Sequence, residues 1–127
     1  MFNWRRPTNL GVTNGRFAPC KRSPNCVSSQ ADPADRQHYI APIAYQGSVA
    51  QLRKAIEELP LATVIRAEGN YLYAEFRTPI LRFVDDVEFL ITENLIQVRS
   101  ASRLGRRDFG ANRSRVEQLR SYLKPAP

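Results

Sequence analysis

The stretch FVDDVEFLITENLIQVRSASRLGRRDFGANRSR, residues 83–115, decides the fold. Its first part holds two strand-like runs on either side of Glu93-Asn94, which suits a two-residue hairpin turn. Side chains alternate along a strand, so this turn determines which residues share a face. The pairs predicted on one face are Ile91 with Ile96, Phe89 with Val98, Val87 with Ser100 and Asp85 with Ser102. That face therefore changes from apolar at the turn to polar at the far end of the hairpin.

The carboxylates of this hairpin are expected in different environments. Glu88 faces Arg99 on the side opposite the apolar pairs, which predicts a cross-strand ion pair. Asp85 and Asp86 are neighbours on one strand and point to opposite faces, so they do not form a catalytic pair with each other. Asp85 is the best candidate for a general base. Its ordinary alternative is an ion pair with a neighbouring arginine.

A basic loop and a helix complete the stretch. The loop, residues 102–111, is rich in arginine and glycine, and Asn112 is a candidate N-cap for the helix that follows. Pro125 ends that helix. A helix N-terminus after a basic, glycine-containing loop can bind an anion through free backbone amides and the helix dipole. The apolar stripe of the helix consists of Val116, Leu119 and Leu123.

A strand and another helix are predicted earlier in the chain. Residues 38–45 favour a strand, and Pro42 places it at a sheet edge or makes it bulged, because proline has no backbone N–H to donate. A helix follows, since Ser48 and Gln51 form a capping box and Pro60 stops the apolar periodicity.

A second hairpin lies between that helix and the deciding stretch. Gly69-Asn70 suits a two-residue turn that pairs Glu68 with Tyr71 and Arg66 with Tyr73. The last two side chains are then close enough for a cation–π contact. The residues predicted on the core face of this hairpin are Ile65, Ala67, Leu72, Ala74 and Phe76.

Residues 1–36 predict an extended arm, because proline and glycine interrupt them at short intervals. Disorder is the alternative for this segment. Isolated apolar side chains along the arm are expected to pin it to the body of the protein. These are Trp4, Leu10, Val12 and Phe17.

The arm ends in CKRSPNCVSS, residues 20–29, where Pro24-Asn25 is typical of a turn. Cys20 and Cys26 could close a small disulfide loop across that turn, but in a reducing cytosol free thiols are the expected state. Zinc is the least favoured alternative, because the cysteine spacing is long and His38 is the only histidine. Neither a metal nor a cofactor is expected.

Length and composition predict one domain. A chain of 127 residues can fold without metal or disulfide support. The predicted fold is α+β, with a largely antiparallel sheet of about five strands, two helices packed on one face, and the arm laid across it. Residues 1–36 form the arm with its cysteine loop and residues 37–124 the α+β domain, together as one structural unit.

Hydropathy and charge narrow the location and the partners. No apolar run reaches the about 20 residues of a membrane span, and no apolar h-region follows the first residues, so a soluble, cytoplasmic protein is expected. The net charge of +7 is unevenly distributed, with basic ends and an acidic middle. Such asymmetry is typical of a surface that meets anions, and a solvated face is the alternative.

Three ordered motifs carry a resemblance: CxxSPNCVSS at 20–29, FVDDVEF at 83–89 and RSASRxGxxDxGxNR at 99–113. They resemble the domain-of-unknown-function family numbered 1499, over about residues 7–123. The arm is most similar to the cyanobacterial and chloroplast branch, which implies a photosynthetic organism and a role near thylakoid membranes. Lys21 departs from the proline of many members. The family brings no established reaction and no assigned catalytic residues.

The leading hypothesis is a non-enzymatic interaction or assembly module whose polar groove binds a protein segment or a small anion. A photosynthetic membrane complex is one candidate partner, and peripheral attachment to the thylakoid membrane is the corresponding location. The residues predicted to line the groove are Cys20, Ser23, Asn25, Cys26, Ser28, Ser29, Asp85, Asp86, Arg99, Ser100, Ser102, Arg103, Asp108, Asn112 and Arg113.

Two alternatives belong to other classes of function. One is a hydrolase-like enzyme that uses Asp85 or Asp86 as a base and the arginine loop to stabilise negative charge. The other is nucleic-acid binding through the basic C-terminal third. Nucleic acid is an unlikely partner, because Phe109 is the only aromatic residue in the basic run on which a base could stack.

Overall fold

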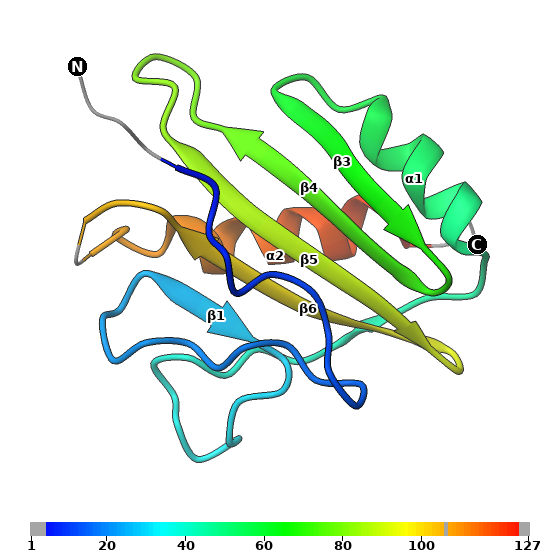
Figure 1. The fold of residues 1–127 in the computed structure, drawn as a ribbon, viewed down its shortest axis with the longest axis horizontal. Coiled ribbons are helices and arrows are strands. Elements are labelled where there is room, and N and C mark those ends of the chain that lie inside the picture. Colours follow the sequence, from blue (N-terminus) through cyan, green and yellow to red (C-terminus); the bar gives the residue numbers. More distant parts are fainter. Residues whose placement is uncertain (1–4, 106, 125–127) are drawn as a thin grey trace.

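The computed structural model describes residues 5–105 and 107–124, so Trp4, Arg106 and Pro125 lie outside the described residues. Six strands form one sheet that is accompanied by two helices (Figure 1). The elements in chain order are β1 (Cys26–Ser28), β2 (Ile43–Ala44), α1 (Val49–Glu57), β3 (Ala62–Glu68), β4 (Tyr71–Arg77), β5 (Val84–Thr92), β6 (Leu95–Ser102) and α2 (Ala111–Tyr122).

The sheet is open and antiparallel, with the order β1-β6-β5-β4-β3 and with β2 also paired to β6. This confirms the predicted α+β class. The strand predicted over residues 38–45 is shorter than expected. Only Ile43–Ala44 pair with β6, and Tyr39 forms an isolated bridge to Ser28. Pro42, which cannot donate to a ladder, lies between these two pairings.

The β5–β6 hairpin has the predicted register. Asp85 lies opposite Ser102, and Glu88 lies opposite Arg99. The turn is made possible by Glu93, whose φ is 52°. The two faces of the hairpin therefore carry the residues that alternation along the strands assigns to them.

The β3–β4 hairpin keeps the predicted pairs near its turn but differs farther away. A bulge between Val64 and Arg66 shifts the register, so Ile65 leaves the core face and is 37% exposed. Its predicted place in the core is therefore wrong, and Val64 packs against the core instead. The guanidinium of Arg66 lies over the ring of Tyr71, at 5.2 Å, and not over the predicted Tyr73.

One face of the sheet carries the main apolar core, and both helices pack there, as predicted. Leu52 and Ile56 of α1 and Val116 and Leu119 of α2 belong to the same buried cluster as the apolar residues of β4, β5 and β6. The helix α1 begins with the predicted capping box of Ser48 and Gln51. Among the described residues, no helix is long and apolar enough to cross a membrane.

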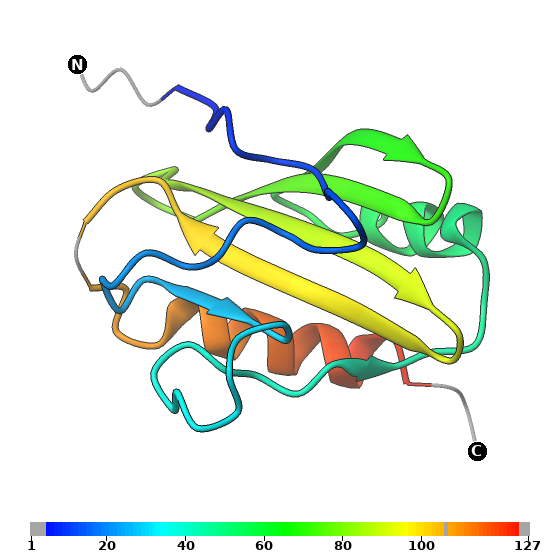
Figure 2. The same cartoon turned by 60° about the horizontal axis from the view of Figure 1, so that its bottom comes forward.

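The N-terminal arm covers the opposite face. Figure 2 shows the arm on one side of the sheet and α2 on the other. Three of the four predicted anchors, Leu10, Val12 and Phe17, pack in a second apolar cluster with residues of β4 and β5. The other buried residues under the arm are polar or charged, namely Glu75, Asp86, Glu88 and Arg99. A polar sheet face is thus enclosed between the sheet and its own arm.

Cys20 and Cys26 form a disulfide, with their Cα atoms 5.7 Å apart. The expectation of free thiols is wrong in this structure. Cys26 lies in β1, where pairing with Ala101 of β6 fixes its backbone, and the arm brings Cys20 alongside it. The cysteine loop is thereby attached to the end of the β5–β6 hairpin.

Candidate functional site

A cavity of about 250 Å³ lies at the polar end of the hairpin, on the face covered by the arm. Seven of its lining residues belong to the predicted groove: Ser23, Asn25, Cys26, Asp86, Arg99, Ser102 and Arg103. The others are Arg5, Pro7, Asn9, Lys21, Ala101 and Gly105. The cysteine loop, the two hairpin strands and the arginine loop therefore meet at one place.

The charges around this cavity are mostly positive, with four basic side chains (Arg5, Lys21, Arg99 and Arg103) and one carboxylate (Asp86). The guanidinium of Arg103 binds that carboxylate in a bidentate manner. Its Nε donates to Oδ2 at 2.9 Å and its Nη2 donates to Oδ1 at 2.8 Å. It also forms an ion pair with Glu75. The carboxylate of Asp86 is therefore already engaged, and an excess of positive charge faces the cavity.

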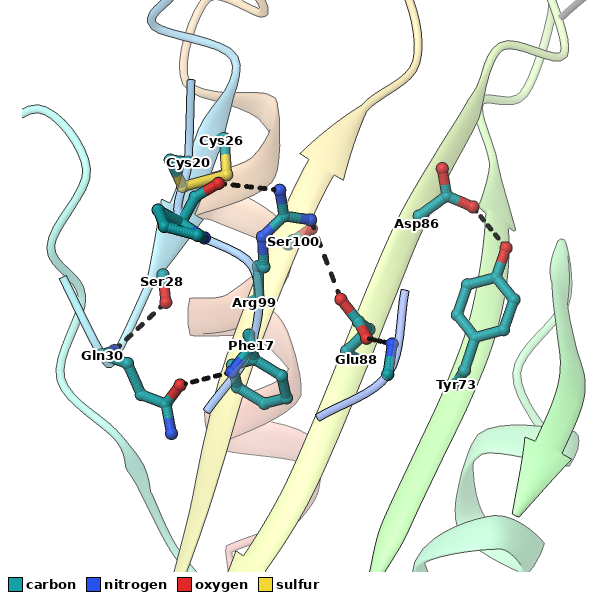
Figure 3. A network of polar contacts seen from close by, with 12 residues as sticks. Phe17, Cys20, Cys26, Ser28, Gln30, Tyr73, Asp86, Glu88, Arg99 and Ser100 are labelled. Carbon is teal, nitrogen blue, oxygen red and sulfur yellow. Dashed lines mark hydrogen bonds and ion pairs between the residues drawn. A yellow bond between two sulfur atoms is a disulfide. The ribbon is translucent and has the colours of Figure 1, made fainter. Parts of the chain in front are cut away.

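Arg99 is buried like Arg103 but makes longer contacts (Figure 3). Its side chain is 7% exposed. One terminal nitrogen donates to the carbonyl of Pro19 at 3.4 Å, and the other lies 3.8 Å from Oε1 of Glu88. Its Nε is buried and has no hydrogen-bond partner among the residues that the structure describes. Burial lowers the pKa of Arg99, against the raising effect of Glu88 and Asp86.

Glu88 is the counterpart of Arg99 and is also only half satisfied. Its Oε2 accepts hydrogen bonds from the Tyr71 hydroxyl and, at 2.7 Å, from the backbone N–H of Gly11. Within the described part of the chain, its Oε1 has no hydrogen-bond partner. Burial raises the pKa of Glu88, although the bonds from Tyr71 and Gly11 and the charge of Arg99 oppose this. Buried polar groups are nearly always hydrogen-bonded, so two orphaned atoms in one ion pair mark this place as unusual.

A second group of predicted residues gathers behind the cavity, around the fully buried side chain of Asn112. Its amide nitrogen donates three hydrogen bonds, of which the bond to Asp108 is 2.6 Å long. Its oxygen accepts two, of which the bond from Ser100 is 2.6 Å long. Its partners are Asn25, Ser100, Ser102, Asp108 and Arg115.

Asn112 is therefore not the N-cap of α2. The N-cap is Gly110, whose φ is 81°, and the carboxylate of Asp108 accepts from the backbone N–H groups of Gly110, at 2.8 Å, and Asn112, at 3.2 Å. The internal carboxylate occupies amides that would otherwise attract an anion. The anion site predicted at this helix N-terminus stays a prediction, and this internal cap weighs against it.

Asp85 forms an ion pair with an arginine, which was the alternative to a role as a general base. Its carboxylate forms an ion pair with Arg115, with 2.6 Å between Nη1 and Oδ2. Burial raises the pKa of Asp85, while Arg115 and the Ser102 hydroxyl oppose that rise. Asp85 points to the helix-covered face and Asp86 to the arm-covered face, as predicted.

Most of the remaining predicted residues form hydrogen bonds that hold loops in place. Ser29 accepts from the Val98 N–H at 2.8 Å, and Ser28 accepts from the Gln30 N–H at 3.1 Å. The guanidinium of Arg113 donates to the carbonyls of Arg36 and Gln37. Cys20 lines a neighbouring cavity, with the rest of the arm's end. Some of the residues predicted to line one groove therefore line this cavity, and the others form hydrogen bonds that hold loops in place.

Several residues of the site escaped the sequence-based prediction. Arg5 and Lys21 line the cavity, and Glu75 and Tyr73 belong to its ion-pair network. The signal for the last two was the alternation in YLYAEFR, which places polar side chains on the face opposite the core. Without a signal that the arm covers this face, such residues are expected to be exposed.

The fold and site define an open-sheet α+β protein that buries a charged sheet face beneath its own N-terminal arm. Over residues 16–123 the chain matches the family model described as "Protein of unknown function (DUF1499)", and it belongs to that family. This match does not distinguish the cyanobacterial and chloroplast branch. Neither the curated proteins nor the solved structures gave a match.

Proposed function

We propose that this protein is a non-enzymatic interaction or assembly module that binds an anionic group in the cavity under the arm. The group is a carboxylate or a phosphate, carried by a protein segment or by a small free anion. One observation carries the proposal: the buried guanidinium of Arg99 lines the cavity, and the contacts of its terminal nitrogens with the described residues are long, 3.4 Å to the Pro19 carbonyl and 3.8 Å to Oε1 of Glu88. Leaving a buried guanidinium poorly paired is costly, and a bound anion would offset that cost.

The size and charge of the cavity agree with this class of ligand. A volume of about 250 Å³ is below the usual range for drug-sized ligands and suits a single charged group. Arg5 and Lys21 lie at the exposed rim, where they would attract an anion toward Arg99. Ser23 and Asn25 line the cavity from the cysteine loop and add polar residues to its wall.

Calorimetric titration with inorganic phosphate and with acetate tests the proposal. We expect saturable binding that Lys21→Ala weakens about threefold, because an exposed charge contributes a fraction of a kcal/mol to about 1 kcal/mol. Lys54→Ala, on the distant helix α1, is the matched control and should leave binding unchanged. Absence of saturable binding of both anions would overturn the proposal, as would equal losses in the two variants.

The proposed biological setting rests on the resemblance of the arm to the cyanobacterial and chloroplast branch. In that setting the ligand is an anionic segment of a photosynthetic membrane complex, and the protein is peripheral to the thylakoid membrane. Affinity purification from a photosynthetic cell that expresses the tagged protein should recover such a complex. Recovery of no membrane-complex partner, together with normal growth after deletion of the gene, would reject this setting without affecting the anion site.

A hydrolase-like activity is the second candidate, because burial raises the pKa of Asp85 at the floor of an apolar cavity of about 430 Å³. A carboxyl group in such a place could exchange protons with a bound substrate. The ion pair with Arg115 weighs against this role. Screening ester and phosphoester substrates, with Asp85→Asn as the control, should show turnover that the substitution abolishes if the enzyme hypothesis is correct.

A further inference from the structure

One end of the sheet presents large apolar side chains directly to solvent. They belong to two loops, residues 78–83 between β4 and β5 and residues 103–105 and 107–110 between β6 and α2, which lie at the same end of the molecule (Figures 1 and 2). Ile80 is 90% exposed, Leu81 67% and Phe109 94%. Apolar side chains this exposed, on two neighbouring loops, are uncommon on a protein that contacts only water.

An apolar cavity of about 430 Å³ connects these loops. Phe83 contributes to it from the first loop, and Leu104 and Phe109 from the second. Phe109 thus borders this cavity, and Ile80 and Leu81 are exposed on the same loop as its lining residue Phe83. We name this region the apolar end, defined by Ile80, Leu81, Phe83, Leu104 and Phe109.

The charges beside the apolar end are mainly positive. Arg82 and Arg107 are exposed on the same two loops, and neither forms an ion pair with any residue that the structure describes. The carboxylates in this region are already engaged, Asp85 by Arg115 and Asp108 by Asn112. A partner of this region would therefore meet apolar side chains flanked by cations.

We propose that the apolar end is a contact surface for a lipid bilayer with anionic headgroups. The apolar side chains would enter the interfacial layer, and Arg82 and Arg107 would contact the headgroups. An anionic bilayer fits this region, because its exposed cations, Arg82 and Arg107, complement the headgroup charge and its exposed apolar side chains can enter the interfacial layer. The contact is limited to the interface, because loop backbone groups must keep their hydrogen bonds to water.

This proposal does not depend on the anion site under the arm or on a photosynthetic setting. The two regions share Ser102 and Gly105 but lie on opposite faces of the β6 end. A variant of one region therefore leaves the side chains of the other in place, and either proposal can fail without the other.

Vesicle co-sedimentation of the full chain tests the lipid contact. We expect binding to vesicles that contain phosphatidylserine and much weaker binding to vesicles of phosphatidylcholine alone. The double variant Ile80→Ser/Phe109→Ser should lose about tenfold or more of the affinity for these vesicles. Arg82→Gln/Arg107→Gln should lose most of the preference for anionic vesicles, and added salt should weaken the binding of the unmodified chain.

Leu95→Ser is the matched control, because Leu95 is 38% exposed at the opposite end of the hairpin and should not affect binding. Unchanged thermal melting of each variant would show that the fold persists, as expected for exposed positions. Failure of the unmodified chain to bind anionic vesicles would overturn the proposal. Equal binding by the Ile80/Phe109 double variant would also overturn it, as would loss of self-association, rather than of lipid binding, in that variant.

Discussion

At the scale of single residues, Asn112 shows why a polar side chain can be essential without being a ligand. Its amide joins the cysteine loop, β6 and the loop before α2 through five side-chain hydrogen bonds. It is fully buried, so water cannot replace a lost partner. The motif residues around it are therefore explained by architecture, whereas Arg99 in the neighbouring cavity is not.

We expect Asn112→Ala to lower the free energy of unfolding by about 3 kcal/mol, because it leaves buried hydroxyl and carbonyl groups without partners. Urea denaturation followed by circular dichroism measures this change. Ser114→Ala, at an exposed position of the same helix, is the control and should change stability by less than about 0.5 kcal/mol. Similar small effects in both variants would show that the network contributes little.

The hydrogen bonds of another single residue, His38, depend on pH. Its Nδ1 lies 2.8 Å from Asp35, and its Nε2 lies 3.1 Å from the carbonyl oxygen of Ser23. These two partners are acceptors, so donating to both requires the doubly protonated imidazolium. The amide nitrogen of Gln37, a donor 3.0 Å from Nε2, favours the neutral ring instead. Burial alone would lower the pKa of His38, but the hydrogen bonds to Asp35 and Ser23 outweigh it, and the pKa is raised.

A raised pKa means that the folded state binds the proton more tightly than the unfolded state. The resulting stabilisation is complete below the ordinary histidine pKa of about 6.5 and is lost as pH rises through the higher folded value. We expect the stability difference between the unmodified chain and His38→Gln to shrink over that interval in thermal melts. Asp35→Asn should flatten this dependence. A difference that grows with pH would contradict the assignment.

At the scale of elements, the cysteine loop is held by its disulfide and by β1. Closing a loop of this size restricts the unfolded chain and stabilises the fold by about 2 kcal/mol. Cys20→Ser/Cys26→Ser should lose about this amount in urea denaturation. Reductant should lower the stability of the unmodified chain and leave the double variant unaffected. Equal stability of reduced and oxidised chains would contradict a structural role for the disulfide.

The elements that sequence reasoning located best were those specified by local turn chemistry. Glu93-Asn94 and Gly69-Asn70 set the pairs nearest each turn, and the capping box set the start of α1. The bulge at Ile65 escaped because alternation assumes an unbroken ladder. The short strand β1 escaped because it is defined by pairing with β6, and no local pattern in three residues reports a distant partner.

The part of the site that follows from the turn of the β5–β6 hairpin was also predictable. The Asp85–Ser102 and Glu88–Arg99 pairs follow from the hairpin register alone. The disulfide required knowledge of how the cysteine loop meets the end of β6. Arg5 was not predictable as a lining residue, because nothing in its neighbourhood shows where the arm crosses the sheet.

At the scale of the whole molecule, the arm converts an exposed polar face into a buried one. Arg6 forms an ion pair with Glu75 at 2.8 Å, and the backbone N–H of Gly11 donates to Glu88 at 2.7 Å. Phe17 and its neighbours cover the tyrosines of β4. The prediction that arm and domain form one structural unit therefore has a physical basis in polar and apolar contacts together.

Deletion of residues 1–18, which keeps both cysteines, tests this unity. We expect a loss on the order of 4 kcal/mol, because the apolar anchors no longer cover the sheet and the carboxylate of Glu88 loses a donor. Hydrogen exchange should then be faster for amides along the uncovered face near Tyr71 and Tyr73.

A full-length chain with Leu10, Val12 and Phe17 all changed to serine separates the contribution of the anchors from that of the arm backbone. It should reproduce most of the stability loss and should also weaken phosphate binding, because Arg5 is no longer held at the cavity rim. If the deletion and the triple variant both unfold at the same urea concentration as the unmodified chain, the rest of the chain is stable without residues 1–18 and that part of the arm is an accessory segment.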